Sequence, residues 1–165
     1  MVKALLRATQ ARAEYLEGET VETIYFGGGT PSLLPTDDIN RILDAVYTYY
    51  PVSNDAEITL EANPDDLTYL KILELARSPV NRLSIGIQSF RNQDLTWMNR
   101  AHNASQADFS VKCAQDRGFN NITIDLIYSI PGMSDRDWLD NIRKAVDLNV
   151  QHISAYSLTI EPKTV

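Results

Sequence analysis

The sequence contains very few of the residue types that most often bind transition metals. It has one cysteine, Cys113, and two histidines, His102 and His152, among 165 residues. A single cysteine excludes an internal disulfide and fits a reducing compartment, and the apolar neighbours of Cys113 predict a small core residue. Neither histidine has a partner at the spacing of metal ligands, so each is expected to be structural or solvated rather than catalytic. We therefore assign no metal ligand and no catalytic residue.

Basic segments and long apolar segments are also missing. The formal net charge is −7 and the isoelectric point is about 4.7, which argues against binding to nucleic acid. No stretch reaches the roughly 18 apolar residues of a membrane span, and the N-terminus lacks a signal-peptide core. With 44% hydrophobic residues, the chain can form one buried core. These features predict one acidic domain located in the cytoplasm.

What the sequence does contain is a regular alternation of strand-like and helix-like segments. The strand-like runs are Val21–Phe26, Glu57–Ala62, Arg82–Gln88, Asn121–Ile127 and His152–Leu158. Helix-like periodicity covers Lys3–Leu16, Asp37–Tyr49, Leu67–Ala76, Asn92–Met98, Ser105–Arg117 and Asp135–Asp147. Thr36 and Ser134 are expected helix N-caps, and Gly118 is an expected helix stop.

Repeated β–α units predict an α/β fold with one parallel sheet, either open or curved into a barrel. The strands should then lie side by side in sequence order. Residues 1–20 are expected to form a leading helix, and residues 21–165 the β–α units of one core domain. A closed barrel would need one more strand before that helix, so we expect a partial barrel that lacks its first strand. Its open edges predict self-association, or a leading helix folded over one edge.

The most informative segment joins the first strand to the next helix. Three glycines, Gly27, Gly28 and Gly29, follow the strand directly and precede Thr30 and Pro31. Glycine has no Cβ and tolerates positive φ, so a ligand could lie against bare backbone amides and carbonyls there. The segment lacks the third glycine of a dinucleotide fingerprint and the Gly-Lys pair of a P-loop. A strand-to-helix turn without a ligand is the alternative.

A polar residue interrupts each later strand-like run near its carboxyl end. Glu61, Gln88 and Asp125 hold these positions in the second, third and fourth runs, and Ser157 and Thr159 close the fifth. In parallel β/α folds, ligand sites lie at the carboxyl ends of the strands. A single such residue would be explained as a paired polar group in the core. The repetition in consecutive strands instead predicts one convergent site.

Arg100 follows the short fourth helix-like segment. A guanidinium there could bind a ligand carboxylate through two parallel hydrogen bonds, which lysine cannot do. An arginine exposed to solvent is the alternative. We expect Arg100 to converge on one cleft with Gly28, Glu61, Gln88 and Asp125.

Five motifs, in this order along the chain, resemble the radical S-adenosylmethionine (SAM) superfamily. They are Gly27-Gly28-Gly29-Thr30-Pro31, Glu61-Ala62-Asn63-Pro64, the segment from Arg82 to Phe90, Asn99-Arg100-Ala101-His102, and Asp125-Leu126-Ile127-Tyr128 followed by Pro131-Gly132. The resemblance is closest to the oxygen-independent coproporphyrinogen III oxidase-like branch. Within that branch, the segment from Tyr156 to Pro162 is most similar to the HemW-type haem chaperones.

The resemblance implies a partial parallel (β/α) barrel with a SAM site. The site residues that it implies are Gly28, Gly29, Thr30, Glu61, Gln88, Arg100 and Asp125. Glu61 would face the methionyl ammonium group, and Arg100 the methionyl carboxylate. Gln88 and Asp125 would face the ribose, and the glycine segment with Thr30 would contact SAM through backbone polar atoms. Each pairing matches a donor with an acceptor.

The family also implies a [4Fe–4S] cluster held by three cysteines of a C-x3-C-x2-C loop, which Cys113 alone cannot replace. The resemblance places that loop before Met1, so the chain as given is expected to lack radical chemistry. Three functions stay open. They are a haem chaperone that passes haem to a membrane acceptor, an oxidase that decarboxylates coproporphyrinogen III, and a cluster-less module that binds a ligand or a partner. The implied partners are SAM and, in the intact protein, haem or a porphyrin.

Overall fold

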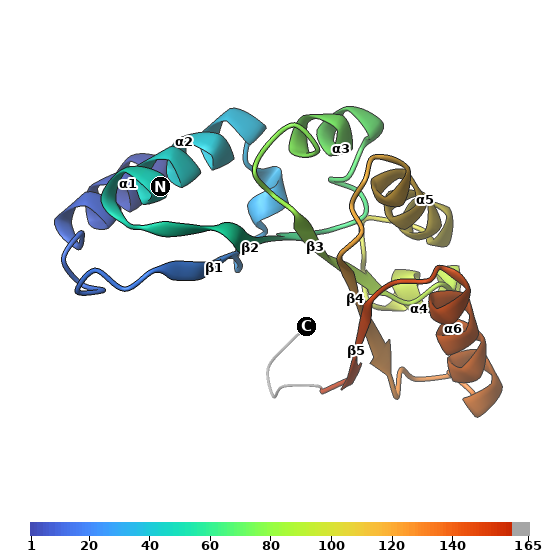
Figure 1. Cartoon of the computed structure of the whole chain (residues 1–165). Helices are drawn as coiled ribbons and strands as arrows, with labels where there is room; N and C mark the ends of the chain where they lie inside the picture. The colour runs from blue at the N-terminus through green and yellow to red at the C-terminus, as the bar shows by residue number, and fades with distance from the viewer. Residues whose placement is uncertain (160–165) are drawn as a thin grey trace.

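A single parallel sheet forms the centre of the computed structural model, which describes residues 1–159. Its five strands lie in the order β1-β2-β3-β4-β5, so each strand pairs with its neighbour in the sequence. They are β1 (Val21–Phe26), β2 (Val52–Ala62), β3 (Arg82–Gln88), β4 (Ile122–Tyr128) and β5 (His152–Ser157). All four pairings are parallel. The sheet curves into a half-barrel with helices along its convex side (Figure 1), and the predicted partial parallel barrel is confirmed.

Within residues 1–159, six α-helices and one short 3-10 helix accompany the strands, and all but the first helix lie between two strands. They are α1 (Val2–Ala11), η1 (Pro31–Leu33), α2 (Thr36–Tyr49), α3 (Tyr69–Leu75), α4 (Asn92–Trp97), α5 (Ala104–Asp116) and α6 (Asp135–Asp147). Ser134 caps α6 by accepting a hydrogen bond from the Asp137 backbone amide, as predicted. Gly118 follows α5 with a φ of +94°, a conformation that glycine adopts without strain.

The predicted N-cap Thr36 is wrong, because Pro35 occupies the cap position of α2. Thr36 is the first helical residue, and its Oγ1 donates a hydrogen bond to Glu74 Oε2 on α3 at 2.9 Å. The largest differences from the expected element bounds are in α1 and β2, and the other bounds differ by one or two residues at most. α1 ends at Ala11 rather than at Leu16, and β2 begins at Val52 because Val21 of β1 pairs with it.

The apolar core lies between the sheet and the helices. Leu83, Ile85 and Ile87 of β3 are fully buried and pack in one cluster with Ile39 and Leu43 of α2. Alternation along the strands places polar side chains on the opposite, concave face. At the amino ends of the strands, Arg82 donates hydrogen bonds to Thr59 Oγ1 at 3.1 Å and to Thr123 Oγ1 at 2.5 Å, which ties three strands together.

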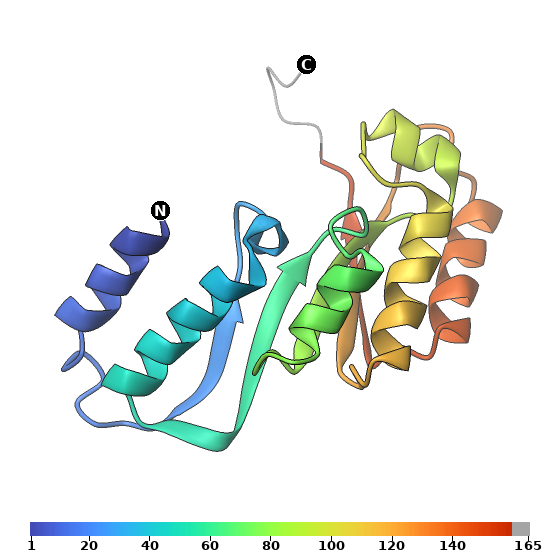
Figure 2. The same cartoon turned by 90° about the horizontal axis from the view of Figure 1, so that it is seen from above.

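The leading helix α1 packs beside α2 on the convex side of the sheet (Figure 2). The Tyr50 hydroxyl at the end of α2 donates a hydrogen bond to the Arg12 carbonyl at 2.7 Å, just past the end of α1. β1 and β5 are the edge strands of the described sheet. Within residues 1–159, no helix has the length and apolar character required to cross a bilayer. The segment from Tyr156 to Pro162, which carries the resemblance to the HemW-type branch, is described only as far as Thr159, and the rest of it lies outside the described residues.

Candidate functional site

A cavity of about 190 Å³ opens at the carboxyl ends of β2, β3 and β4. It is lined by Thr30, Glu61, Ala62, Asn63, Ser84, Gly86, Gln88, Arg100 and Asp125. Five of the seven predicted site residues therefore lie around one cavity, because parallel strands end at the same edge of the sheet. These five residues are Thr30, Glu61, Gln88, Arg100 and Asp125. All five are half-buried, so their polar atoms remain within reach of a ligand.

The other two predicted residues, Gly28 and Gly29, line an adjacent cavity of about 430 Å³. Thr30 is a lining residue of both cavities. The φ angles of Gly28 and Gly29 are +74° and +86°, a conformation that other residues rarely adopt. The glycine segment thus presents bare backbone next to the polar cavity, as expected for a surface that a ligand approaches closely.

Glu61 is held in a fixed orientation by two donors. Its Oε1 accepts a hydrogen bond from the Tyr25 hydroxyl at 2.7 Å, and its Oε2 accepts one from the Gly28 amide at 2.9 Å. Partial burial and the Glu61 carboxylate raise the pKa of Tyr25, which keeps this hydroxyl protonated as a donor. Each carboxylate oxygen retains a further lone pair. Glu61 can therefore accept an additional hydrogen bond from a cationic ligand group.

Arg100 approaches the cavity with only neutral partners. Its Nη2 donates to Asn63 Oδ1 at 2.6 Å, and Asn63 Nδ2 donates to Thr30 Oγ1 at 3.2 Å. Among residues 1–159, no carboxylate lies within ion-pair distance of Arg100. The positive charge of the guanidinium is therefore available to an anionic ligand group.

Gly86 lets the side chains around it come together. A Cβ at this position would lie 2.8 Å from Gln88 Nε2, 3.4 Å from Asn63 Oδ1 and 3.6 Å from Arg100 Nη2. Contacts this short would displace the amide of Gln88. The bare backbone of β3 at Gly86 is thus part of the wall of the cavity.

Asp125 adds a second carboxylate to the same cavity. Burial raises the pKa of the Asp125 carboxyl group. The hydrogen bond with Ser154 lowers this pKa, and the negative charge of Glu61 raises it further. The cavity is thus lined by two carboxylates and one guanidinium, and the guanidinium of Arg100 forms no ion pair with either carboxylate. Such a site fits a zwitterionic or mixed-charge ligand better than a purely apolar one.

Sequence reasoning missed four residues that shape the site: Tyr25, Asn63, Ser84 and Gly86. A signal was present for three of them, because Asn63 belongs to the motif that contains Glu61, and Ser84 and Gly86 precede Gln88 at a spacing of two and share its strand face. No sequence signal identified Tyr25 as the partner of Glu61, because the two residues are 36 positions apart.

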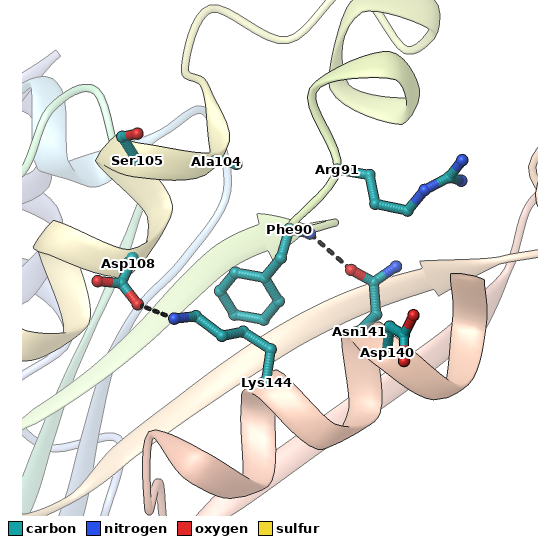
Figure 3. A pocket seen from close by; sticks show the side chains of 8 residues that line it. All are labelled: Phe90, Arg91, Ala104, Ser105, Asp108, Asp140, Asn141 and Lys144. Atoms are coloured by element: carbon teal, nitrogen blue, oxygen red, sulfur yellow. Dashed lines mark hydrogen bonds and ion pairs between the residues drawn. The ribbon is translucent and has the colours of Figure 1, made fainter. Parts of the chain in front are cut away.

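A third hollow, of about 470 Å³, lies between α5 and α6 (Figure 3). Its charged side chains and the Asn141 amide have partners within the protein. Lys144 Nζ lies 2.6 Å from Asp108 Oδ1, and the Phe90 amide donates to Asn141 Oδ1 at 2.7 Å. None of the predicted site residues lines it. This hollow is a groove between two packed helices and lies apart from the carboxyl ends of the strands.

The residues present do not fit an iron–sulfur cluster. No group of three or more His, Cys, Asp or Glu side chains within residues 1–159 could hold a metal ion. Cys113 is buried in α5, and burial raises the pKa of its thiol, which disfavours the thiolate form that binds iron.

Known proteins are similar to the chain in both sequence and structure. Residues 6–145 match the radical SAM superfamily. Heme chaperone HemW of Escherichia coli (strain K12) is 39% identical over 164 residues, which cover 99% of this chain and 43% of the relative. Heme chaperone HemW of Lactococcus lactis is 38% identical over the same shares of both chains. The chain thus spans less than half the length of these curated relatives.

Solved structures share the fold. The coproporphyrinogen III oxidase HemN from Escherichia coli, a radical SAM enzyme, superposes with a TM-score of 0.88 at 27% identity, covering 97% of this chain and 37% of that one. Archaeal Elp3 from Methanocaldococcus infernus superposes with a TM-score of 0.77 at 19% identity, covering 97% of this chain and 43% of that one. The latter likeness concerns the fold alone.

Proposed function

Because the chain belongs to the radical SAM superfamily, we propose that the cavity at the carboxyl ends of β2, β3 and β4 binds SAM. The observation that carries the proposal is the position of Arg100, whose guanidinium has only neutral partners among residues 1–159 and faces the same cavity as Glu61 and Asp125. SAM carries an ammonium group, a carboxylate and a ribose diol. The cavity offers a complementary group for each of them.

The methionyl end of SAM is assigned to Glu61 and Arg100. Glu61 is oriented by Tyr25 and Gly28 and keeps lone pairs for the ammonium group. Arg100 provides donors for the carboxylate, and Asn63 fixes the direction of the guanidinium. Charge-assisted hydrogen bonds of this kind are shorter and stronger than neutral ones.

The nucleoside end of SAM is assigned to Gln88, Asp125 and the glycine segment. The Gln88 amide and the Asp125 carboxylate supply acceptors for a diol, and both line the cavity. The cavity itself is below the roughly 300 Å³ at which typical ligand pockets begin, so the rest of the ligand would extend past Thr30 along Gly28 and Gly29. The described residues supply no ligands for a [4Fe–4S] cluster, so their proposed role is limited to holding SAM.

For the whole protein we propose a role in haem or porphyrin metabolism, as a haem chaperone. The 39% identity to heme chaperone HemW of Escherichia coli supports this role. Oxidation of coproporphyrinogen III is the second candidate, favoured by the TM-score of 0.88 to HemN. A haem titration followed by absorbance, and mass spectrometry of coproporphyrinogen III after incubation, distinguish the two. We further propose that the free edges of β1 and β5 allow self-association.

Titration of the 15N-labelled chain with SAM tests the proposed site. Arg100→Ala should weaken SAM binding by about 10- to 100-fold, the effect of losing a hydrogen bond to a charged group. Arg143→Ala is the matched control, because Arg143 is exposed on α6 and pairs with Asp140 at 2.8 Å. It should bind SAM like the unmodified chain. Equal SAM affinity of the two variants would contradict the assignment of Arg100.

A further inference from the structure

His102 is a buried imidazole with one satisfied nitrogen and one unsatisfied nitrogen. Its side chain is fully buried, and Nε2 lies 3.0 Å from the Ile87 carbonyl oxygen. Nδ1 has no hydrogen-bond partner and lies 3.6 Å from Asp65 Oδ1, which is too far for a hydrogen bond. Burial lowers the pKa of His102 and the Arg100 charge lowers it further, and together they outweigh the opposing effects of the Ile87 hydrogen bond and the Asp65 carboxylate. The neutral ring therefore carries its proton on Nε2 and donates it to Ile87.

The carbonyl that His102 contacts belongs to an unusual turn. The Ser89 amide donates to the same Ile87 oxygen at 2.8 Å, and Gln88 between them has a φ of +66°. This three-residue turn is rare and strained for a residue with a side chain. The pairing of β3 with β4 also shifts register between Ile85 and Gln88. Such conformations persist only where the surrounding structure holds them in place.

The chain beyond the turn is anchored from α6. Asn141 Oδ1 accepts from the Phe90 amide at 2.7 Å (Figure 3), and Asn141 Nδ2 donates to Ser89 Oγ at 3.1 Å. Ser89 Oγ in turn donates to Asp94 Oδ2 at 2.6 Å. Ser89, Asp94 and Asn141 are all buried. The turn at Gln88 is thus fixed on its far side by Asn141 and on its near side by His102.

We propose that His102 is a positioning residue that holds the turn at Gln88, through its Nε2 hydrogen bond to the Ile87 carbonyl, and so directs the Gln88 side chain into the cavity. His102 lies two residues after Arg100, so the same loop places the Arg100 guanidinium at the cavity and supports the Gln88 side-chain amide on β3. The expected effect of His102 on SAM binding rests on the function proposed above. Its expected effect on the conformation of the turn is independent of that function.

Three measurements on the ligand-free chain test the conformational part. A 15N spectrum of the His102 ring should show a neutral imidazole with its proton on Nε2, and a proton on Nδ1 would overturn the proposal without any substitution. In His102→Gln the amide nitrogen can still donate to Ile87, so the backbone chemical shifts of Gln88 should keep their positive-φ values. In His102→Met, which has similar length and no donor, they should move toward negative-φ values. Unchanged shifts in His102→Met would refute the role.

Titrations with SAM and with L-methionine, which has no ribose, test the functional part. His102→Met should weaken SAM binding by about tenfold and leave L-methionine binding within about twofold of the unmodified chain. His102→Gln should restore most of the SAM affinity. In a Gln88→Ala background, His102→Met should weaken SAM binding no further, because the side chain that it positions is gone. An equal additional loss in that background would show that His102 does not act through Gln88.

The two proposals fail in different ways. If neither Gln88→Ala nor Arg100→Ala weakens SAM binding, the assignment of the cavity to SAM is wrong, and the ligand-free spectra still decide the role of His102. If both substitutions weaken SAM binding and His102→Met does not, the cavity assignment stands and the positioning role is wrong.

Discussion

The two carboxylates of the cavity, Glu61 and Asp125, differ in how well neighbouring groups compensate their negative charge. Glu61 accepts hydrogen bonds from Tyr25 and Gly28, which compensate its charge. Asp125 is more poorly compensated, because burial raises the pKa of its carboxyl group and the Glu61 charge adds to this effect. An uncompensated charge at a binding site costs stability in the absence of ligand and is available to a ligand when it binds. Asp125 is therefore expected to favour ligand binding at the expense of stability.

Asp125→Asn should raise the free energy of unfolding at pH 7 by about 0.5–2 kcal/mol and weaken SAM binding. The folded-state pKa of Asp125 lies above its unfolded value. The stability of the unmodified chain therefore falls as pH rises through the folded pKa, whereas the amide has no charge to lose. The advantage of Asp125→Asn should disappear as pH falls toward the unfolded value of about 3.9. Urea unfolding at pH 4 and pH 7 measures this, and a less stable variant at pH 7 would contradict it.

Gly86→Ala should separate binding from folding. The added Cβ would lie 2.8 Å from Gln88 Nε2, the far end of a flexible side chain that can move, and the φ of Gly86 is not positive. The free energy of unfolding should thus change by no more than about 1 kcal/mol. SAM binding should weaken by about tenfold because the Gln88 amide is displaced. Thermal unfolding and SAM titration of the same sample check both parts. Normal affinity, or loss of the fold, would contradict this account of Gly86.

At the scale of elements, the sequence predicts the strands and also predicts that their carboxyl ends lie at one end of the sheet. The β-branched and alternating apolar residues of β1 and β3 predict both strands with the same bounds that the structure shows. Glu61 and Asp125 meet because consecutive parallel strands direct their carboxyl ends to the same place. This convergence follows from the topology alone. It requires no knowledge of individual side-chain contacts.

Contacts between distant elements explain what the sequence could not predict. Threonine is a residue type that favours N-cap positions, yet the Thr36 hydroxyl donates a hydrogen bond to Glu74 on α3, and Pro35 occupies the cap position of α2. The polar start of β2, from Val52 onward, is a strand because β1 lies beside it. The hydrogen bond between His102 and Ile87 likewise joins two segments that no local pattern relates. Local propensity cannot identify partners that only the tertiary structure brings together.

At the scale of the whole molecule, the half-barrel separates a closed face from an open one. Helices cover the convex face, where Leu83 and Ile85 are fully buried (Figure 1). The concave face carries polar side chains and remains uncovered by any element within residues 1–159. Parallel sheets are normally buried on both faces. An uncovered concave face and two free edges are therefore the parts of this fold that most favour contact with another chain or a large ligand.

Association through the free edge of β1 should follow from the unpaired backbone groups there. Light scattering during gel filtration should give a mass that rises above 18.6 kDa toward twice that value as concentration increases. Thr23→Lys places a charge on the exposed part of β1 and should keep the chain monomeric, because lysine on an edge strand disfavours pairing with a second strand. Thr48→Lys, on the exposed side of α2, is the matched control and should leave association unchanged. A constant mass of 18.6 kDa for the unmodified chain over the whole range would contradict self-association, and equal association of the two variants would place the contact away from β1.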